Sequence, residues 1–144
     1  MTTQRFDPSL SDVMAGQHLG VLATIKRDGR PQLSVLSYTF DPDTALLRVS
    51  TIESLAKVAN LRRDPRASFQ VTNEKAWGYV VAEGEAELSA VSESPDDATV
   101  EELVEVYRAI QGEHPDWEDY RAVMVKDRRL VLRVRVDRLY GAVA

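Results

Sequence analysis

Hydroxyl, amide and ammonium side chains gather at one predicted junction between a strand and a helix. Ser50 and Thr51 end an apolar run, and Lys57 and Asn60 lie one and two turns into a helix predicted over residues 54–63. Free backbone N–H groups and the helix dipole favour an anion at such an N-terminus. The lysine adds a full positive charge, which suits a phosphate. The segment alone nevertheless favours a plainer interpretation, in which Ser54 caps the helix and Lys57 is solvated.

Two further pairs of side chains have the spacing of a single strand face. Gln32 and Ser34 lie two apart in a strand predicted over residues 31–40, and Trp77 and Tyr79 lie two apart in a later strand. Alternate residues of a strand share a face, so the members of each pair point the same way. Each pair could meet a ligand, and aromatic rings with polar tips suit a flat one. The alternatives are a solvated face for the first pair and core packing for the second.

A basic run follows the predicted helix at Arg62, Arg63 and Arg66. It could attract an anionic ligand tail or partner. Basic residues in the last turn of a helix more often complement the helix dipole, and that interpretation holds unless an anion site lies next to them.

Several kinds of chemistry are excluded by composition. The chain has no cysteine, which removes disulfides, thiolate metal sites and cysteine nucleophiles. Its two histidines, His18 and His114, are too few and too far apart to indicate a metal cluster, so we expect no metal site; we expect the first to be structural and the second solvated. No Ser-His-Asp, paired-carboxylate, P-loop or GxGxxG arrangement occurs. If the protein is an enzyme, a cofactor therefore supplies the difficult chemistry.

The acidic and basic residues are segregated along the chain. The formal net charge is −5, from 18 Lys+Arg and 23 Asp+Glu, and residues 92–119 hold ten of the acids but a single base, Arg108. The remaining 116 residues therefore carry 13 acids and 17 bases, a net charge of +4. We expect the acidic segment to lie away from an anion-binding end of the molecule.

Length and hydropathy indicate a soluble globular protein. The 144 residues fit one domain over 1–144, with 44% hydrophobic residues. No apolar run approaches the ~20 residues of a membrane span, and the first residues, MTTQRFDP, lack the apolar region of a signal peptide. We therefore expect a cytoplasmic protein with no membrane span. We also expect no nucleic-acid binding, because no strand shows a basic-aromatic stripe.

The hydrophobic periodicity predicts a mainly β protein with helices. Six strands, joined largely by tight turns, indicate a mainly antiparallel barrel, and two helices over about 97–125 form an excursion before the last strand. The expected strands cover residues 18–26, 31–40, 45–51, 66–72, 77–90 and 129–136, with short helices over about 8–17 and 54–63. Thr99 and Glu102 have the spacing of a capping box at the start of the excursion.

Three blocks of sequence carry a resemblance to a known superfamily. The segments GVLATIKRDGRPQLSVLSYTF (20–40), KVANLRRDPRASF (57–69) and WGYVVAEGEAELS (77–89) resemble the split β-barrel flavin/deazaflavin oxidoreductases, which include the pyridoxamine 5′-phosphate oxidases. The resemblance is greatest to the actinobacterial branch that uses the deazaflavin coenzyme F-420, and it extends through residues 102–129.

This resemblance implies an FMN-binding-like split barrel that forms a homodimer with cofactor sites at the subunit interface. It implies a phosphate site at Ser50, Thr51, Lys57 and Asn60; ring contacts at Gln32 and Ser34; contacts from the partner subunit at Trp77 and Tyr79; and Arg62 and Arg63 near the polyglutamate tail.

The chain departs from the family pattern at three places. It lacks the C-terminal Arg-Leu-His motif of the pyridoxamine oxidase branch, which counts against pyridoxamine phosphate oxidation. It carries Val35 and Leu55 where relatives in the F-420 branch often have a polar residue and an arginine.

The resemblance thus implies an F-420-dependent reductase that transfers a hydride to a small electron-poor organic substrate. No residue is assigned as a catalytic acid or base, although Tyr79 could relay a solvent proton. An FMN-binding oxidoreductase of the same fold and a non-catalytic cofactor-binding protein are the alternatives. The sequence does not name the substrate, because variable loops build the pockets of such folds.

Overall fold

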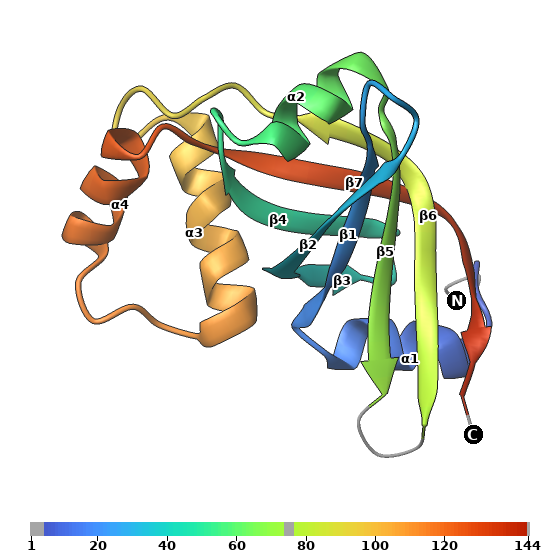
Figure 1. Cartoon of the computed structure of the whole chain (residues 1–144). Helices are drawn as coiled ribbons and strands as arrows, with labels where there is room; N and C mark the ends of the chain where they lie inside the picture. The colour runs from blue at the N-terminus through green and yellow to red at the C-terminus, as the bar shows by residue number, and fades with distance from the viewer. Residues whose placement is uncertain (1–4, 74–76, 144) are drawn as a thin grey trace.

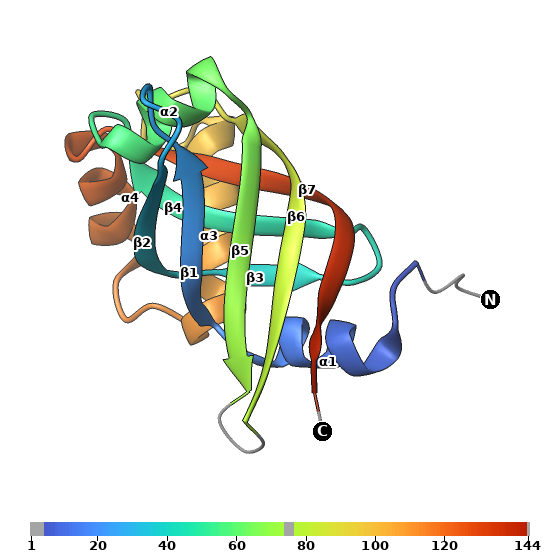
Figure 2. The ribbon, with the colours of Figure 1, turned by 45° about the vertical axis from the view of Figure 1, so that its right-hand side comes forward.

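Seven antiparallel strands form one curled sheet within residues 5–73 and 77–143, the part of the chain that this computed structural model describes. Their order is β2-β1-β5-β6-β7-β4-β3, and the sheet wraps around its own inner face (Figures 1 and 2). The elements are α1 (Pro8–Gly16), β1 (Leu19–Ile25), β2 (Pro31–Ser37), β3 (Thr39–Asp41), β4 (Leu46–Ile52), α2 (Ala56–Arg63), β5 (Arg66–Asn73), β6 (Gly78–Leu88), α3 (Ala98–Gln111), α4 (Trp117–Lys126) and β7 (Arg129–Ala142).

The expectation of six strands is wrong, because the run 31–40 divides at Tyr38. β2 pairs with β1, whereas β3 pairs with β4 at the opposite edge of the sheet. The Tyr38 backbone N–H donates to the His18 carbonyl at 3.0 Å, and its hydroxyl donates to the Met14 carbonyl at 2.5 Å. This fully buried residue therefore fixes the point where the chain leaves one ladder for another. The Nδ1 atom of His18 lies 3.1 Å from the Tyr38 carbonyl oxygen, in agreement with a structural histidine.

The last strand is longer than its expected range of 129–136. β7 pairs with β4 through its first half and with β6 along most of its length. A register shift at Glu83 and Gly84 lets β6 follow it. A Cβ atom on Gly84 would stand 2.0 Å from the Arg135 carbonyl oxygen, so the close approach of the two strands requires glycine there.

Two hydrophobic cores lie on opposite sides of β7. Its residues alternate along the strand, so Leu132 and Val134 face the first core, inside the curled sheet, while Val131 faces the second, beneath α3 and α4. The first core is closed at one end by α1, whose N-cap Asp7 accepts a hydrogen bond from the Ser9 N–H at 2.9 Å. The second core attaches the helical excursion to the sheet (Figure 1).

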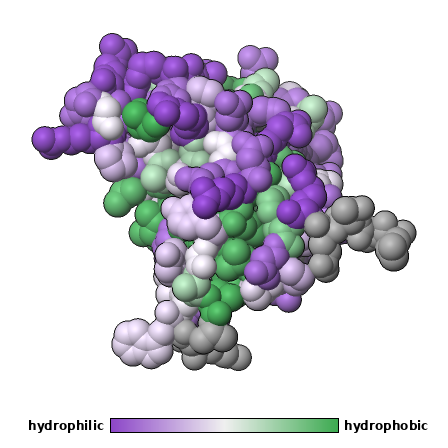
Figure 3. Space-filling view, turned by 90° about the vertical axis from the view of Figure 1, so that its right-hand side faces the viewer, coloured by the Kyte–Doolittle hydropathy of each residue, from purple (hydrophilic) through white to green (hydrophobic). Residues whose placement is uncertain are grey.

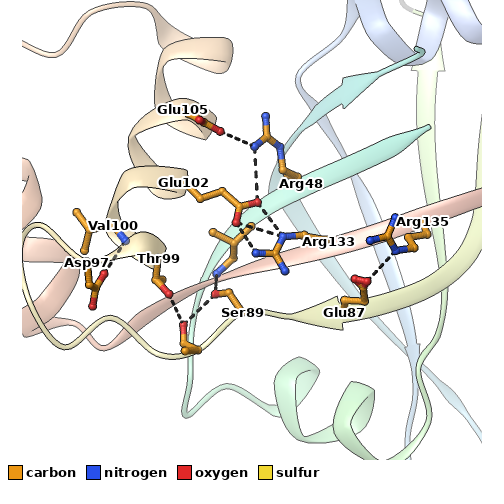
Figure 4. A network of polar contacts seen from close by, with 12 residues as sticks. Arg48, Glu87, Ser89, Asp97, Thr99, Val100, Glu102, Glu105, Arg133 and Arg135 are labelled. Carbon is orange, nitrogen blue, oxygen red and sulfur yellow. Dashed lines mark hydrogen bonds and ion pairs between the residues drawn. The ribbon is translucent and has the colours of Figure 1, made fainter. Parts of the chain in front are cut away.

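Ion pairs also hold the excursion on the sheet. The Glu102 carboxylate on α3 accepts a hydrogen bond from Arg133 Nε on β7 at 2.8 Å and lies 3.6 Å from Arg48 Nη1 on β4 (Figure 4). Arg48 also donates to Glu105 at 3.0 Å. The Arg133 hydrogen bonds lower the pKa of Glu102 below its ordinary value. Part of the acidic segment therefore meets the basic remainder of the chain, and the two are not separate in space.

Helix α3 begins two residues earlier than the capping-box spacing suggests. Asp97 is the N-cap of α3 and accepts from the Val100 N–H at 2.9 Å, while Thr99 Oγ1 donates to the Ala90 carbonyl (Figure 4). The capping box of Thr99 and Glu102 is thus wrong, because both side chains have other partners. Among residues 5–73 and 77–143, no helix is long and apolar enough to cross a membrane.

Replacement of Tyr38 by phenylalanine should destabilise the fold. The change leaves the buried Met14 carbonyl without this donor, and we expect the free energy of unfolding to fall by about 1–3 kcal/mol. Urea denaturation followed by circular dichroism measures the loss. The control is Tyr140→Phe, at an exposed tyrosine, which should change stability by less than ~0.5 kcal/mol. Equal effects of the two substitutions would contradict the role given to the Tyr38 hydroxyl.

Candidate functional site

The N-terminus of α2 has no side-chain cap. Leu55 occupies the N-cap position without a capping hydrogen bond, so the interpretation of Ser54 as the cap is wrong. Within the described residues, the backbone N–H groups of Ala56 and Lys57 have no hydrogen-bond partner. Free donors at a helix N-terminus attract an anion.

Lys57, whose backbone N–H is one of these donors, also carries a half-buried side-chain ammonium. It forms no hydrogen bond or ion pair with any residue that the structure describes. Burial lowers the pKa of Lys57 below its ordinary value, because the charged form is partly removed from water. An anion bound there would compensate for the lost hydration, so the group fits a phosphate better than it fits a purely structural role.

The structure does not bring the side chains of Ser50 and Thr51 to one place. They are adjacent in β4, and burial alternates along that strand, so the two side chains point to opposite faces. Thr51 is buried toward the interior of the sheet. Ser50 points to the side of α3 and α4, where its Oγ accepts a hydrogen bond from Arg129 Nη1 at 3.2 Å.

Two other predicted residues, Gln32 and Asn60, are brought into direct contact. The buried Asn60 amide donates to Gln32 Oε1 at 2.7 Å and to Thr24 Oγ1 at 3.1 Å. Its carbonyl oxygen accepts from Arg63 Nη2 at 3.0 Å, and Arg63 also donates to the Ile25 carbonyl. The polar groups of Asn60 are thus used within the protein. Its role is to hold Gln32, not to offer a free donor to a ligand.

Ser34 continues the face of β2 that Gln32 occupies. Along this strand Gln32, Ser34 and Leu36 are half-buried, and the residues between them are exposed. The predicted alternation is therefore confirmed, and the fully solvated interpretation of the polar pair is wrong.

Tyr79 lies on the outer side of the sheet, but the expectation that Trp77 shares its strand face is wrong. Trp77 lies in a turn with a φ of 53°, and β6 begins at Gly78. Trp77 is fully exposed and Tyr79 is 41% exposed, so core packing does not explain this pair. Strand pairing places Tyr79 on the same outer face as four other exposed apolar residues. We call this set the outer apolar face: Leu19, Leu33, Val35, Tyr79 and Tyr140. The side of the molecule drawn in Figure 3 likewise shows apolar surface exposed between hydrophilic regions.

A cavity of about 370 Å³ lies where the helical excursion meets β2 and β4. Its lining is mostly apolar, with polar groups from both the sheet and the helices. The residues are Val35, Leu36, Ser37, Ser50, Val106, Tyr107, Ile110, Gln111, Tyr120, Met124 and Arg129. Of the predicted site residues, Ser50 lines this cavity.

Arg129 is the polar residue that sequence reasoning missed. Its Nε atom is buried and has no hydrogen-bond partner among the residues that the structure describes, and the Asp127 carboxylate stands 3.9 Å away. In the sequence it is one of several arginines that alternate with apolar residues, a pattern typical of a solvated strand face. No local feature of the sequence distinguishes Arg129 from the solvated arginines of the same strand. Residues 5–73 and 77–143 also contain no group of three His, Asp or Glu side chains that could hold a metal.

A protein-family model described as pyridoxamine 5′-phosphate oxidase matches residues 6–142. The chain belongs to this family. It is 27% identical over 141 residues to an F420H2-dependent biliverdin reductase from Mycobacterium tuberculosis, covering 98% of this chain and 91% of that protein. Family membership therefore confirms that this chain has the split-barrel fold that the resemblance implies.

Two solved structures support the same fold. A conserved hypothetical protein from Mycobacterium tuberculosis has a TM-score of 0.70 and 24% identity, with 95% of this chain and 84% of that chain covered. An F420 reductase has a TM-score of 0.69 and 19% identity, with 93% and 98% covered. At these identities, the similarity to both structures supports the fold alone.

The two neighbouring arginines of α2 allow a matched test of the Asn60 network. Arg63→Met removes the hydrogen bonds to Asn60 and to the Ile25 carbonyl, and we expect a loss of about 1–2 kcal/mol in unfolding free energy. Arg62→Met, at an exposed position one residue earlier, should change stability by less than ~0.5 kcal/mol. Chemical denaturation of both variants provides the comparison, and a neutral Arg63→Met would refute the structural role of this side chain.

Proposed function

We propose that this protein is an F-420-dependent reductase. The observation that carries the proposal is the half-buried, unpaired Lys57 ammonium beside the uncapped N-terminus of α2, within the described part of the chain. These groups fit the phosphate of a deazaflavin cofactor, and the F420H2-dependent relative supports the choice of cofactor. When bound, the reduced deazaflavin supplies a hydride to an electron-poor double bond, and a solvent proton completes the two-electron reduction.

Different residues of this chain would bind different parts of the cofactor. Lys57 and the free N–H groups of α2 hold the phosphate. The Ser50 hydroxyl, at the adjoining end of β4, takes no part in this because it accepts a hydrogen bond from Arg129. Gln32, fixed by Asn60, and Ser34 line the ring along β2. Thr51 supports the strand end from inside, because its side chain is buried. The acceleration of hydride transfer would come chiefly from the proximity and orientation of cofactor and substrate, because no residue is assigned as an acid or base.

We further propose that the active form is a homodimer joined through the outer apolar face. An exposed cluster of Leu33, Val35 and Leu19, each more than 60% exposed, is unusual unless another surface covers it. Tyr79 stands on this side of the sheet, and together with the exposed Trp77 of the preceding turn it would complete the cofactor site of the partner subunit.

A second candidate is an FMN-dependent oxidoreductase. Membership of the pyridoxamine 5′-phosphate oxidase family supports it, and the phosphate site described above suits either cofactor. Side-by-side titration with F-420 and with FMN separates the two. We expect F-420 to bind at micromolar concentration and added FMN to leave the preparation without bound flavin.

Replacement of Lys57 by alanine should weaken F-420 binding by about 1.5–3 kcal/mol, the range for a hydrogen bond to a charged group. Isothermal titration calorimetry measures the change. The control is Lys26→Ala, an exposed lysine 4.0 Å from Asp28, which should leave the Kd unchanged. Because burial lowers the pKa of Lys57, F-420 affinity of the wild type should also fall as pH rises through that lowered pKa. Unaltered binding by Lys57→Ala would remove the basis of the proposed phosphate site.

Introduction of a charge on the outer apolar face should separate the subunits. Leu33→Glu places a carboxylate in the centre of the proposed interface, and we expect the mass in solution to fall from twice 16.1 kDa to 16.1 kDa. Sedimentation equilibrium gives the mass. Thr44→Glu, in the exposed turn between β3 and β4, serves as the control and should remain dimeric. A monomeric wild type would rule out this interface.

A further inference from the structure

The cavity beneath the helical excursion combines an apolar wall with one charged group. Val106 and Ile110 from α3 and Met124 from α4 face Leu36 of β2 across it. Tyr107 and Tyr120 stack edge to face, with ring centroids 5.1 Å apart. The volume of about 370 Å³ lies within the usual range for small-molecule sites.

Arg129 is the charged group, and its hydrogen-bonding capacity is only partly used. Nη1 donates to Ser50 at 3.2 Å, whereas the buried Nε has no hydrogen-bond partner among the residues described. The nearest carboxylate, that of Asp127, stays at 3.9 Å, outside hydrogen-bond distance. The Tyr120 hydroxyl donates to the Leu103 carbonyl at 2.9 Å and is therefore not free to satisfy a ligand. The side chain is nevertheless 29% exposed, so its outer N–H groups can donate charge-assisted hydrogen bonds to a carboxylate in the cavity.

We propose that this cavity is the substrate site and that it selects a flat, largely apolar molecule bearing a carboxylate, which Arg129 binds. The apolar wall would cover the ring system, and Ser50 would hold the guanidinium in place. The identification of the ligand as substrate rests on the proposed function. The binding site itself does not, because its lining residues and charge are independent of any cofactor.

The position of the cavity suits a substrate more than a cofactor phosphate. The unpaired Lys57 and the free N–H groups at the start of α2 already provide a phosphate site. The cavity instead offers one guanidinium in a mainly apolar lining, which suits a single carboxylate on a hydrophobic body. Its rim includes Val35, which also belongs to the outer apolar face, so the cavity opens near the proposed subunit interface.

The test uses two probes of equal shape, 2-naphthoate and the neutral 2-naphthamide, with the full chain and no added cofactor. We expect the wild type to bind 2-naphthoate about tenfold more tightly than 2-naphthamide, as measured by titration calorimetry. Arg129→Leu should abolish this preference and leave the 2-naphthamide Kd within about twofold. Arg128→Leu is the matched control: this neighbouring arginine is exposed and paired with Glu53 at 2.8 Å, and its loss should preserve the tenfold preference.

The methionines of the chain provide a readout of location. Met124 lines the cavity, whereas Met14 lies in the separate core inside the sheet. In protein labelled with ¹³C at the methionine methyl groups, 2-naphthoate should shift the Met124 signal and leave that of Met14 in place. Ile110→Trp, which fills the cavity, should eliminate binding of both probes, and it does so without touching Arg129.

Several outcomes would overturn the proposal. They are the absence of 2-naphthoate binding, equal affinity for the two probes, retention of the preference in Arg129→Leu, and a shift of Met14 instead of Met124. Competition between F-420 and 2-naphthoate would also overturn it, since the cavity would then belong to the cofactor. Failure of F-420 to bind while the probes behave as expected would reject the proposed function and leave the anion-selective cavity standing.

Discussion

The half-buried carboxylate of Glu102 is the contact on which the arrangement of helices and sheet depends. It lies between guanidinium groups from two different strands, Arg133 on β7 and Arg48 on β4, so it fixes α3 against both at once (Figure 4). Loss of one member of such a cluster leaves an uncompensated charge in a partly desolvated place. The cavity exists because this anchor holds α3 in place while α4 packs on α3 and β7, which leaves space between the helices and the edge of β2.

Structural and ligand-directed groups are divided between neighbouring residues of α2. Asn60 and Arg63 donate side-chain hydrogen bonds to β1 and β2, and these bonds fix the helix in position. Lys57, one turn earlier, forms no polar contact with the described residues. A helix held by side-chain hydrogen bonds while one of its cations stays unpaired is the arrangement that the proposed anion site requires.

The elements and several site residues were predictable from sequence because their signals are local. Alternation places Gln32 and Ser34 on one half-buried face, and Asp7 with the following proline marks the start of α1. The split at Tyr38 was not predictable, since it depends on bonds to the distant Met14 and His18. Adjacent residues of a strand point to opposite faces, so the sequence itself predicts that the side chains of Ser50 and Thr51 cannot both contact one phosphate.

The position of Arg129 at the cavity could not be predicted from local sequence patterns. Its significance comes from Ser50, 79 residues away, and from helices that pack over both. An arginine in an alternating strand has no local feature that separates a solvated charge from one beneath a helix. Only the tertiary packing of the excursion creates the difference.

The helical excursion leaves and rejoins the sheet at almost the same level. Leu88 of β6 pairs with Leu132 of β7, and just beyond this pair the Ser89 N–H donates to the Val131 carbonyl at 2.9 Å. Insertions or deletions within the excursion therefore leave the register of every strand pair unchanged. The groups of α2 in the proposed phosphate site lie outside it, whereas six of the residues that line the cavity belong to α3 and α4: Val106, Tyr107, Ile110, Gln111, Tyr120 and Met124. A change of the helical excursion can accordingly replace this wall of the cavity as a unit and leave the proposed anion site of α2 in place.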